Sequence, residues 1–294
     1  MPNHELEVLA PAKVNLFLSV LGKRADGYHD VVSVMQKLDL ADRLHIRLEG
    51  TGISLHCPSS TIPEDSRNLA WKAARLFFDQ TGIKDGVRIT LHKKIPVAAG
   101  LGGGSSDAAA VLVGLNSLCS TGLDTEILLN MAARLGADVP FFVADMKTAL
   151  ATGTGTKLHA IDGPEGYWLL LVNPGLEVST RWVYENLILT SGDNPYKLSG
   201  YSYLSEYAAS LLEAGFNRGS SEHGLFNDLE TVTVAKHPLI STIKEQLLAD
   251  GAFAALMSGS GPTVFGLFRQ RDLAEKSCHA FSQLYRDVFL AAPL

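Results

Sequence analysis

The chain has 294 residues, of which 46% are hydrophobic and 19% are charged, and its net charge is −6. This composition is typical of a globular protein with room for about two domains, and it excludes a disordered chain. The acidic balance argues against a general nucleic-acid binder, which normally presents a basic face. It leaves room for an anionic small ligand, because a local nest of backbone amides can bind phosphate on an acidic protein.

Cysteine usage and the N-terminus indicate a reducing compartment. Cys57, Cys119 and Cys278 are far apart and form no C-x-x-C pair, so neither a disulfide framework nor a zinc site follows. The segment 1–9 lacks the pattern of a secretory signal, and no apolar run reaches the length of about 18 residues that a membrane span requires. We therefore expect a cytoplasmic protein that does not bind membranes, whose oligomeric state the sequence leaves open.

Apolar periodicity predicts an α+β first half. Alternating apolar side chains predict strands over residues 14–21, 44–48 and 87–91. Helical spacing predicts helices over residues 69–77, 108–115 and 127–135, the last with Asp124 as its N-cap. A segment rich in glycine and threonine, 153–166, then indicates a linker, which divides the chain into domains 1–155 and 156–294.

The second half is predicted to contain more helix than strand. The expected strands are 168–172, 254–257, 263–268 and a short one near Val288. The expected helices are 180–189, 203–214, 238–250 and 273–285.

The strongest local signal is a glycine-rich loop, Pro96 to Ser106, that runs directly into an apolar helix. Its four glycines let the backbone approach a ligand closely, and the helix N-terminus supplies free amides and partial positive charge. Together these favour binding of a triphosphate, to which Ser105 or Ser106 can add a hydroxyl. The alternative is a glycine-rich turn with a serine N-cap and no ligand. The spacing matches neither a Walker A loop nor a dinucleotide fingerprint.

A second glycine-rich turn lies between two short apolar strands, in the segment Met257 to Phe265. On local sequence alone it is a hairpin turn. Beside the first loop it becomes a candidate second wall for the phosphates.

Several polar residues stand out but have ordinary explanations. Lys13 and Asn15 are two apart on a predicted strand and therefore face the same way, which is also true of a solvent-facing strand edge. Asp138 stands at a predicted helix start, where an N-cap is the simplest explanation. Tyr28 and His29 follow a turn and are expected, on local sequence, to be surface packing.

Three segments together resemble the GHMP kinase superfamily, which includes galactokinase, homoserine kinase and mevalonate kinase. They are APAKVNLFL (Ala10–Leu18), PVAAGLGGGSSDAA (Pro96–Ala109) and LGADVPFF (Leu135–Phe142). With RADGYHDVVSVMQ (Arg24–Gln36), the chain is most similar to the branch that phosphorylates CDP-methylerythritol in non-mevalonate isoprenoid synthesis. The resemblance implies a two-domain α+β kinase fold with the active site in the interdomain cleft, and a need for ATP and Mg²⁺.

The resemblance also assigns roles to residues of this sequence. Lys13 and Asp138 match the catalytic pair, with Asp138 as the general base. Asn15, Tyr28, His29, Thr180 and Tyr184 match positions that bind the substrate, the aromatic residues at its cytosine end. ATP is expected to contact Asn68 and Lys93 and the loop residues Pro96, Val97, Ala98, Ala99, Gly100, Leu101, Gly102, Gly103, Gly104, Ser105 and Ser106. The resemblance assigns no ligand to the magnesium ion.

Two departures and two rival functions qualify this picture. Val97-Ala98-Ala99 stands where some members carry more glycine, and the segment Ser191 to Ser205 has no clear counterpart. One rival is a kinase of the same superfamily that acts on mevalonate or a sugar, which would need no stacking aromatic. The other is a non-catalytic nucleotide-binding protein on this fold, which would need neither Lys13 nor Asp138.

Overall fold

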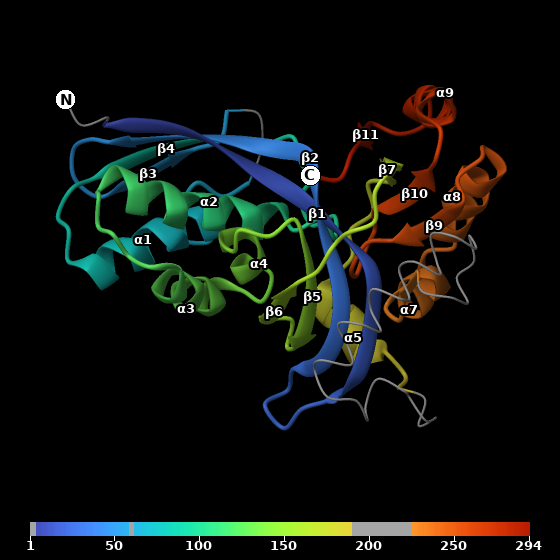
Figure 1. Cartoon of the computed structure of the whole chain (residues 1–294), viewed down its shortest axis with the longest axis horizontal. Helices are drawn as coiled ribbons and strands as arrows, with labels where there is room; N and C mark the ends of the chain where they lie inside the picture. Colours follow the sequence, from blue (N-terminus) through green and yellow to red (C-terminus); the bar gives the residue numbers. More distant parts are fainter. Residues whose placement is uncertain (1–3, 59–61, 190–224) are drawn as a thin grey trace. The chain divides into compact units, whose positions relative to one another are not determined.

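The structure is a computed structural model that describes residues 4–58, 62–189 and 225–294. Its strands, all but β8 labelled in Figure 1, are β1 (Glu5–Lys23), β2 (His29–Leu48), β3 (Ile53–His56), β4 (Val87–His92), β5 (Thr148–Gly153), β6 (Lys157–Ala160), β7 (Trp168–Asn173), β8 (Phe226–Asn227), β9 (Ala254–Met257), β10 (Val264–Phe268) and β11 (Asp287–Ala291). Its helices are α1 (Leu69–Thr81), α2 (Gly103–Leu118), α3 (Thr125–Leu135), α4 (Val139–Val143), α5 (Thr180–Asn186), α7 (Glu230–Lys236), α8 (Leu239–Ala249) and α9 (Arg271–Ser282).

The chain divides into two compact units, and strands β1 and β2 each contribute residues to both. The first unit comprises Met1–Ala12, Leu40–Val97 and Gly102–Met146. The second unit comprises Lys13–Asp39, Ala98–Leu101 and Lys147–Leu294. The boundary near residue 155, expected from composition, remains a prediction about how the chain divides into domains.

In the first unit, helices pack on one face of a sheet with strand order β3-β4-β2-β1. The alternation that predicted the strands explains why: Leu44 and Ile46 are buried, while the neighbouring His45 and Arg47 are at least partly exposed. They pack with Ile89 of β4 against the apolar sides of α1 and α2. In Figure 1 the helices of this unit lie together on one side of its strands.

In the second unit, the strands β11-β7-β10-β9 form a four-stranded antiparallel sheet. All five residues of β10 are buried, as expected of a central strand covered on both faces. Helix α8 packs on β9 and β10, and α9 packs on β7, β10 and β11. Strands β5 and β6 form a hairpin that pairs with β2, and β8 pairs in parallel with β1.

Most elements expected from the sequence are present, with Asp124 as the N-cap of α3. Several expectations were wrong in detail, among them the end of the last helix, which is Ser282 rather than residue 285. The helix after the glycine-rich loop begins at Gly103, before the serines, with Gly102 at its N-cap position. The expected linker contains β6, because glycines with positive φ at 153 and 155 turn the chain back along β5. The helix expected to end at residue 189 ends at Asn186. The expected helix 203–214 and the segment Ser191 to Ser205 lie outside the described residues.

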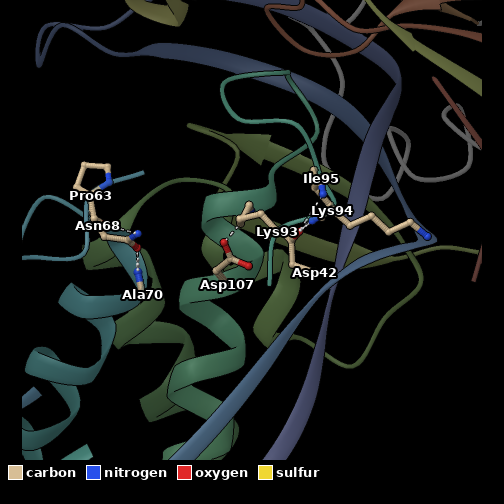
Figure 2. Close-up of polar contacts among 8 residues, drawn as sticks. All are labelled: Asp42, Pro63, Asn68, Ala70, Lys93, Lys94, Ile95 and Asp107. Carbon is tan, nitrogen blue, oxygen red and sulfur yellow. Dashed lines mark hydrogen bonds and ion pairs between the residues drawn. The ribbon is translucent and has the colours of Figure 1, made fainter. Parts of the chain in front are cut away.

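A buried ion network in the first unit connects β2, the segment after β4, and α2 (Figure 2). The ammonium of Lys93 donates to Asp42 Oδ2 and, at 2.9 Å, to Asp107 Oδ2. Asp42 Oδ1 accepts the backbone amides of Lys94 at 2.5 Å and Ile95 at 2.8 Å. The network therefore fixes both ends of the glycine-rich loop within this unit: the strand exit before it and the helix after it.

The network encloses one positive and two negative groups in a site that excludes water. Burial raises the pKa of Asp107 to about 7, although the charge of Lys93 opposes this rise. Burial by itself would lower the pKa of Lys93, but the two carboxylates more than offset it and raise that pKa. Among the described residues Asp107 Oδ1 has no hydrogen-bond partner, so this oxygen is where a proton on Asp107 is most easily accommodated.

Asp107→Asn should change how stability depends on pH. In the wild type, the native state binds the Asp107 proton more tightly than the unfolded state, so its free energy of unfolding falls as pH rises from about 4 to about 7. Asparagine retains an oxygen for Lys93 but does not titrate. The free energy of unfolding of the variant minus that of the wild type should therefore increase as pH rises across this range. Urea unfolding at a series of pH values measures this difference.

The control for this measurement is Asp145→Asn, which removes an exposed carboxylate of the same unit. It should leave the pH profile of the wild type nearly unchanged. Parallel profiles for the wild type and Asp107→Asn would show that Asp107 does not titrate in this window.

Candidate functional site

The glycine-rich loop has an alternating backbone conformation. Ala98, Gly100 and Gly102 have φ values of 53°, 76° and 71°, while the residues between them have ordinary negative φ. Backbone with residues in the left-handed region can turn successive amides toward one side, as in anion-binding nests. Glycine is needed for this at two of the three positions, and Ala98 adopts the conformation despite its side chain.

The first two residues of α2 have different surroundings. A methyl group on Gly103 would lie 3.0 Å from Ile95 Cγ2 and 3.1 Å from Lys93 Nζ, so this residue is closed in by its own unit. Gly104 is exposed, and a methyl group there would meet only Leu69 Cδ1, at 3.8 Å. Ser106 is buried, and its hydroxyl has no hydrogen-bond partner among the described residues. The helix N-terminus thus leaves an open surface at Gly104.

Lys93 and Asn68 both have clear structural roles within the first unit. Figure 2 shows the Lys93 ammonium directed at Asp42 and Asp107, whereas the side chain of Lys94 extends away from the two carboxylates. Asn68 is the N-cap of α1: its Oδ1 accepts from Ala70 N at 2.9 Å and its Nδ2 donates to Pro63 O at 2.9 Å. Contact of either residue with a nucleotide stays a prediction.

Lys13 and Asn15 form a buried polar chain in the second unit. Lys13 is 4% exposed and Asn15 is 3% exposed, so the solvent-face explanation of these residues is wrong. Lys13 Nζ donates to Asn15 Oδ1 at 2.6 Å, and Asn15 Nδ2 donates to Ser33 Oγ at 2.8 Å. Ser33 in turn donates to the carbonyl of Phe17 at 2.7 Å. The Lys13 ammonium is thus held in a buried position by the side chain of Asn15.

The second glycine-rich turn connects β9 to β10 and is therefore a hairpin turn, but it also supports the first loop. Ser258 Oγ donates to the carbonyl of Gly100 at 2.9 Å. A methyl group on Gly100 would lie 2.1 Å from the carbonyl oxygen of Ser258, so only glycine fits there. A methyl group on Gly259 would lie 3.6 Å from Lys13 Nζ. The turn thus lies against both Gly100 and the Lys13 side chain.

Asp138 stands at the N-cap position of α4 but does not cap it. Its backbone has helical φ and ψ values of −83° and −15°, and its side chain makes no capping hydrogen bond. The N-cap explanation of this residue is therefore wrong. Asp138 lies in the first unit and is half-buried.

Two rings of the second unit pair at the substrate-binding positions expected from the sequence. The His29 and Tyr184 rings have centroids 5.0 Å apart and planes inclined at 30°. Burial and the nearby charge of Lys23 lower the pKa of His29, which favours the neutral, aromatic imidazole. Tyr28 is 65% exposed, and Thr180 at the start of α5 exchanges a hydrogen bond of 2.8 Å with Ser260 Oγ.

Sequence reasoning missed the residues that hold these groups in place, chiefly Asp42, Asp107 and Asn227. Asp107 directly follows the loop serines and could have been noticed. Asp42 and Asn227 lie far along the chain from their partners, Lys93 and Gly259. Their local sequence gives no sign of these contacts. Among the described residues there is no cluster of three or more metal-binding side chains, and no helix has the length and apolarity to cross a membrane.

Two family models match the sequence. The GHMP kinases N terminal domain matches residues 68–145, which include the glycine-rich loop and Asp138. The GHMP kinases C terminal domain matches residues 208–287, which include the turn at Ser258.

Individual relatives match nearly the whole chain. A 4-diphosphocytidyl-2-C-methyl-D-erythritol kinase from Syntrophotalea carbinolica is 48% identical over 93% of this chain and 93% of its own. One from a Geobacter species is 48% identical over 98% of both chains. The crystal structure of a 4-(cytidine 5'-diphospho)-2C-methyl-D-erythritol kinase superposes with a TM-score of 0.80 at 35% identity, over 97% of this chain and 98% of that one. With both domain models matched and identity of this extent, the chain belongs to the GHMP kinases, in the family of the 4-diphosphocytidyl-2-C-methyl-D-erythritol kinases.

Proposed function

We propose that the protein transfers the γ-phosphoryl group of ATP to the 2-hydroxyl of 4-diphosphocytidyl-2-C-methyl-D-erythritol, giving the 2-phosphate, in non-mevalonate isoprenoid precursor synthesis. The observation that carries the proposal is 48% identity, over nearly the full length of both chains, to relatives with that name. The reaction takes place in the cytoplasm, where ATP is available.

The glycine-rich loop binds the triphosphate of ATP in this proposal. Alternating left-handed residues and the open N-terminus of α2 at Gly104 supply amides and partial positive charge. Because phosphoryl transfer has a loose transition state, positioning and charge stabilisation supply most of the catalysis.

The described residues fit a magnesium ion that arrives with ATP better than one held by a protein cage. Mg²⁺ usually keeps several waters and binds phosphate oxygens with few protein ligands. The unpartnered hydroxyl of Ser106, or that of Ser105, can contribute one oxygen. The ion would neutralise charge on the β- and γ-phosphates.

Asp138 and Lys13 carry the chemistry. Asp138 accepts the proton of the 2-hydroxyl as the phosphoryl group leaves ATP, a contribution of about 10²–10⁴-fold for a general base. Lys13, buried and held by Asn15, stabilises negative charge on the transferring group. The missing capping bond at Asp138 and the burial of Lys13 support these roles.

His29 and Tyr184 bind the cytosine end of the substrate. Their paired rings offer aromatic faces on which a base can stack. A mevalonate or sugar kinase would need no such pair.

A coupled assay of ADP release with four alcohols tests the function. The cytidine-diphosphate substrate should be turned over, and mevalonate, galactose and homoserine should not. Turnover of one of the other alcohols would favour a different GHMP kinase, and binding of ATP without turnover would favour a non-catalytic protein.

Gly104→Ala should weaken ATP binding while slightly stabilising the protein. Alanine is better than glycine inside a helix by up to about 1 kcal/mol, and the added methyl group meets nothing closer than 3.8 Å in its own chain. If the phosphates of ATP pack against the backbone of Gly104, the added methyl group would clash with them. Calorimetric titration with ATP and thermal unfolding measure the two effects. An unchanged ATP affinity would place the phosphates elsewhere.

Tyr184→Ala should weaken binding of the cytidine substrate and leave ATP binding unchanged. Loss of stacking worth about 1–3 kcal/mol corresponds to a decrease in affinity of roughly 5- to 150-fold. The control is Tyr285→Ala, which removes a half-buried tyrosine stacked on Phe281 in the same unit. Equal loss of both affinities in Tyr184→Ala would indicate damage to the unit rather than loss of a cytosine contact.

Asp138→Asn should lower kcat by about 10²–10⁴-fold with little change in ATP affinity, because asparagine cannot accept the proton. Lys13→Ala should behave similarly, and the double variant should lose little more, since residues that act as a unit are not additive. Asp124→Asn is the control: Asp124 does cap a helix, accepting from Ile127 N at 2.9 Å, and asparagine caps equally well. Near-normal turnover in Asp138→Asn would end the assignment of the base.

A further inference from the structure

Asn227 is a buried side chain of the second unit that the proposed mechanism does not use. It is 4% exposed and lies in β8, opposite Leu18 of β1. Its Nδ2 donates two hydrogen bonds, to Met257 O at 2.8 Å and to Gly259 O at 2.7 Å. Its Oδ1 accepts from Leu229 N at 3.0 Å, at the start of α7. Both amide hydrogens are therefore spent on the turn that follows β9.

The residues after Asn227 anchor the same short segment to β1 and β9. Asp228 Oδ2 accepts from Val20 N at 2.7 Å and from Ser19 Oγ at 3.1 Å, both on β1. Glu230 Oε2 accepts from Met257 N at 2.9 Å, and its other oxygen pairs with Lys244. The segment Asn227–Glu230 thus connects the strand that carries Lys13 to the turn at residues 258–261.

This turn is in contact with groups to which the proposed function gives a role. Ser258 donates to the carbonyl of Gly100 in the glycine-rich loop. A methyl group on Gly259 would lie 3.4 Å from Asn15 Oδ1 and 3.6 Å from Lys13 Nζ. The Gly259 carbonyl is the group that Asn227 holds at 2.7 Å. Asn227 therefore holds the backbone of the turn at the residue that lies next to Lys13 and Asn15.

We infer that Asn227 is a positioning residue: by holding the carbonyls of Met257 and Gly259, it fixes the turn that sets the position of the Lys13 ammonium and of Gly100. The expected effect on kcat rests on the proposed function. That Asn227 positions the turn does not depend on that function. The two carbonyls are acceptors only, so a side chain that cannot donate two hydrogens at this place leaves at least one of them buried and unpaired.

Asn227→Asp and Asn227→Ala test the inference. Aspartate keeps the shape but puts an oxygen against two carbonyl oxygens, and alanine removes the donors with less repulsion. The control is Ser277→Ala, which deletes a buried hydrogen bond of 2.6 Å to Asp250 in the same unit. For each variant we would measure thermal stability, kcat, both KM values, and the ¹H–¹⁵N resonances of Gly259, Gly100 and Lys13 in the free enzyme.

We expect kcat to fall by about 100-fold in both Asn227 variants, as for a misplacement of about 1 Å at a catalytic group. The KM for the cytidine substrate should change less than about 3-fold, because the hydrogen bonds of Asn227 go to Met257, Gly259 and Leu229 rather than to His29 or Tyr184. The three amide resonances should shift in the Asn227 variants and stay unchanged in Ser277→Ala.

A folded Asn227→Ala enzyme with kcat within about 3-fold of the wild type would overturn the inference, as would unmoved resonances of Gly259 and Gly100. The inference would also be overturned if Ser277→Ala lost as much stability as the Asn227 variants and showed the same fall in kcat. If wild-type protein does not phosphorylate the cytidine substrate, the proposed function fails, and the resonances alone then decide whether Asn227 positions the turn.

Discussion

The ammonium of Lys93, buried between two carboxylates, is the interaction on which the rest of the first unit depends. Such a network is costly to bury, and it is retained only where its geometry satisfies the charges. Here Asp42 also accepts two backbone amides, so the segment before the loop is tied to β2 while Asp107 ties down α2. The loop amides are therefore presented from two fixed ends, which is the preorganisation that an electrostatic catalyst requires.

The second unit uses neutral groups for the same purpose. Lys13 donates to the amide oxygen of Asn15 at 2.6 Å. Asn15 is fixed in turn by Ser33, and Asn227 fixes the turn on the other side of Lys13. Lys13 and Asn15 are therefore held in place by side-chain hydrogen bonds within the second unit.

The sequence predicted well those features that depend on neighbours along the chain. Alternation in Leu44 to Leu48 and the glycines of the loop specify local backbone, and both appear as expected. Features that depend on distant partners could not be predicted this way: Asp42 and Lys93 are 51 residues apart, and Asn227 and Gly259 are 32 apart. The error at the linker is of the same kind, because only the pairing of β6 with β5 shows that this segment is a strand.

Ala98 shows how these long-range contacts bear on function. A non-glycine residue with φ of 53° costs of order 1–3 kcal/mol, and it persists only where its surroundings determine the backbone. Its neighbours are held by the second glycine-rich turn, through Ser258 to the carbonyl of Gly100 and through the Thr263 amide to that of Ala99, at 3.4 Å. Glycine in place of Ala98 would adopt this conformation without strain. It would also make the loop more flexible before ligand binds. Strain at Ala98 therefore accompanies a loop that is already in its alternating conformation before any ligand arrives.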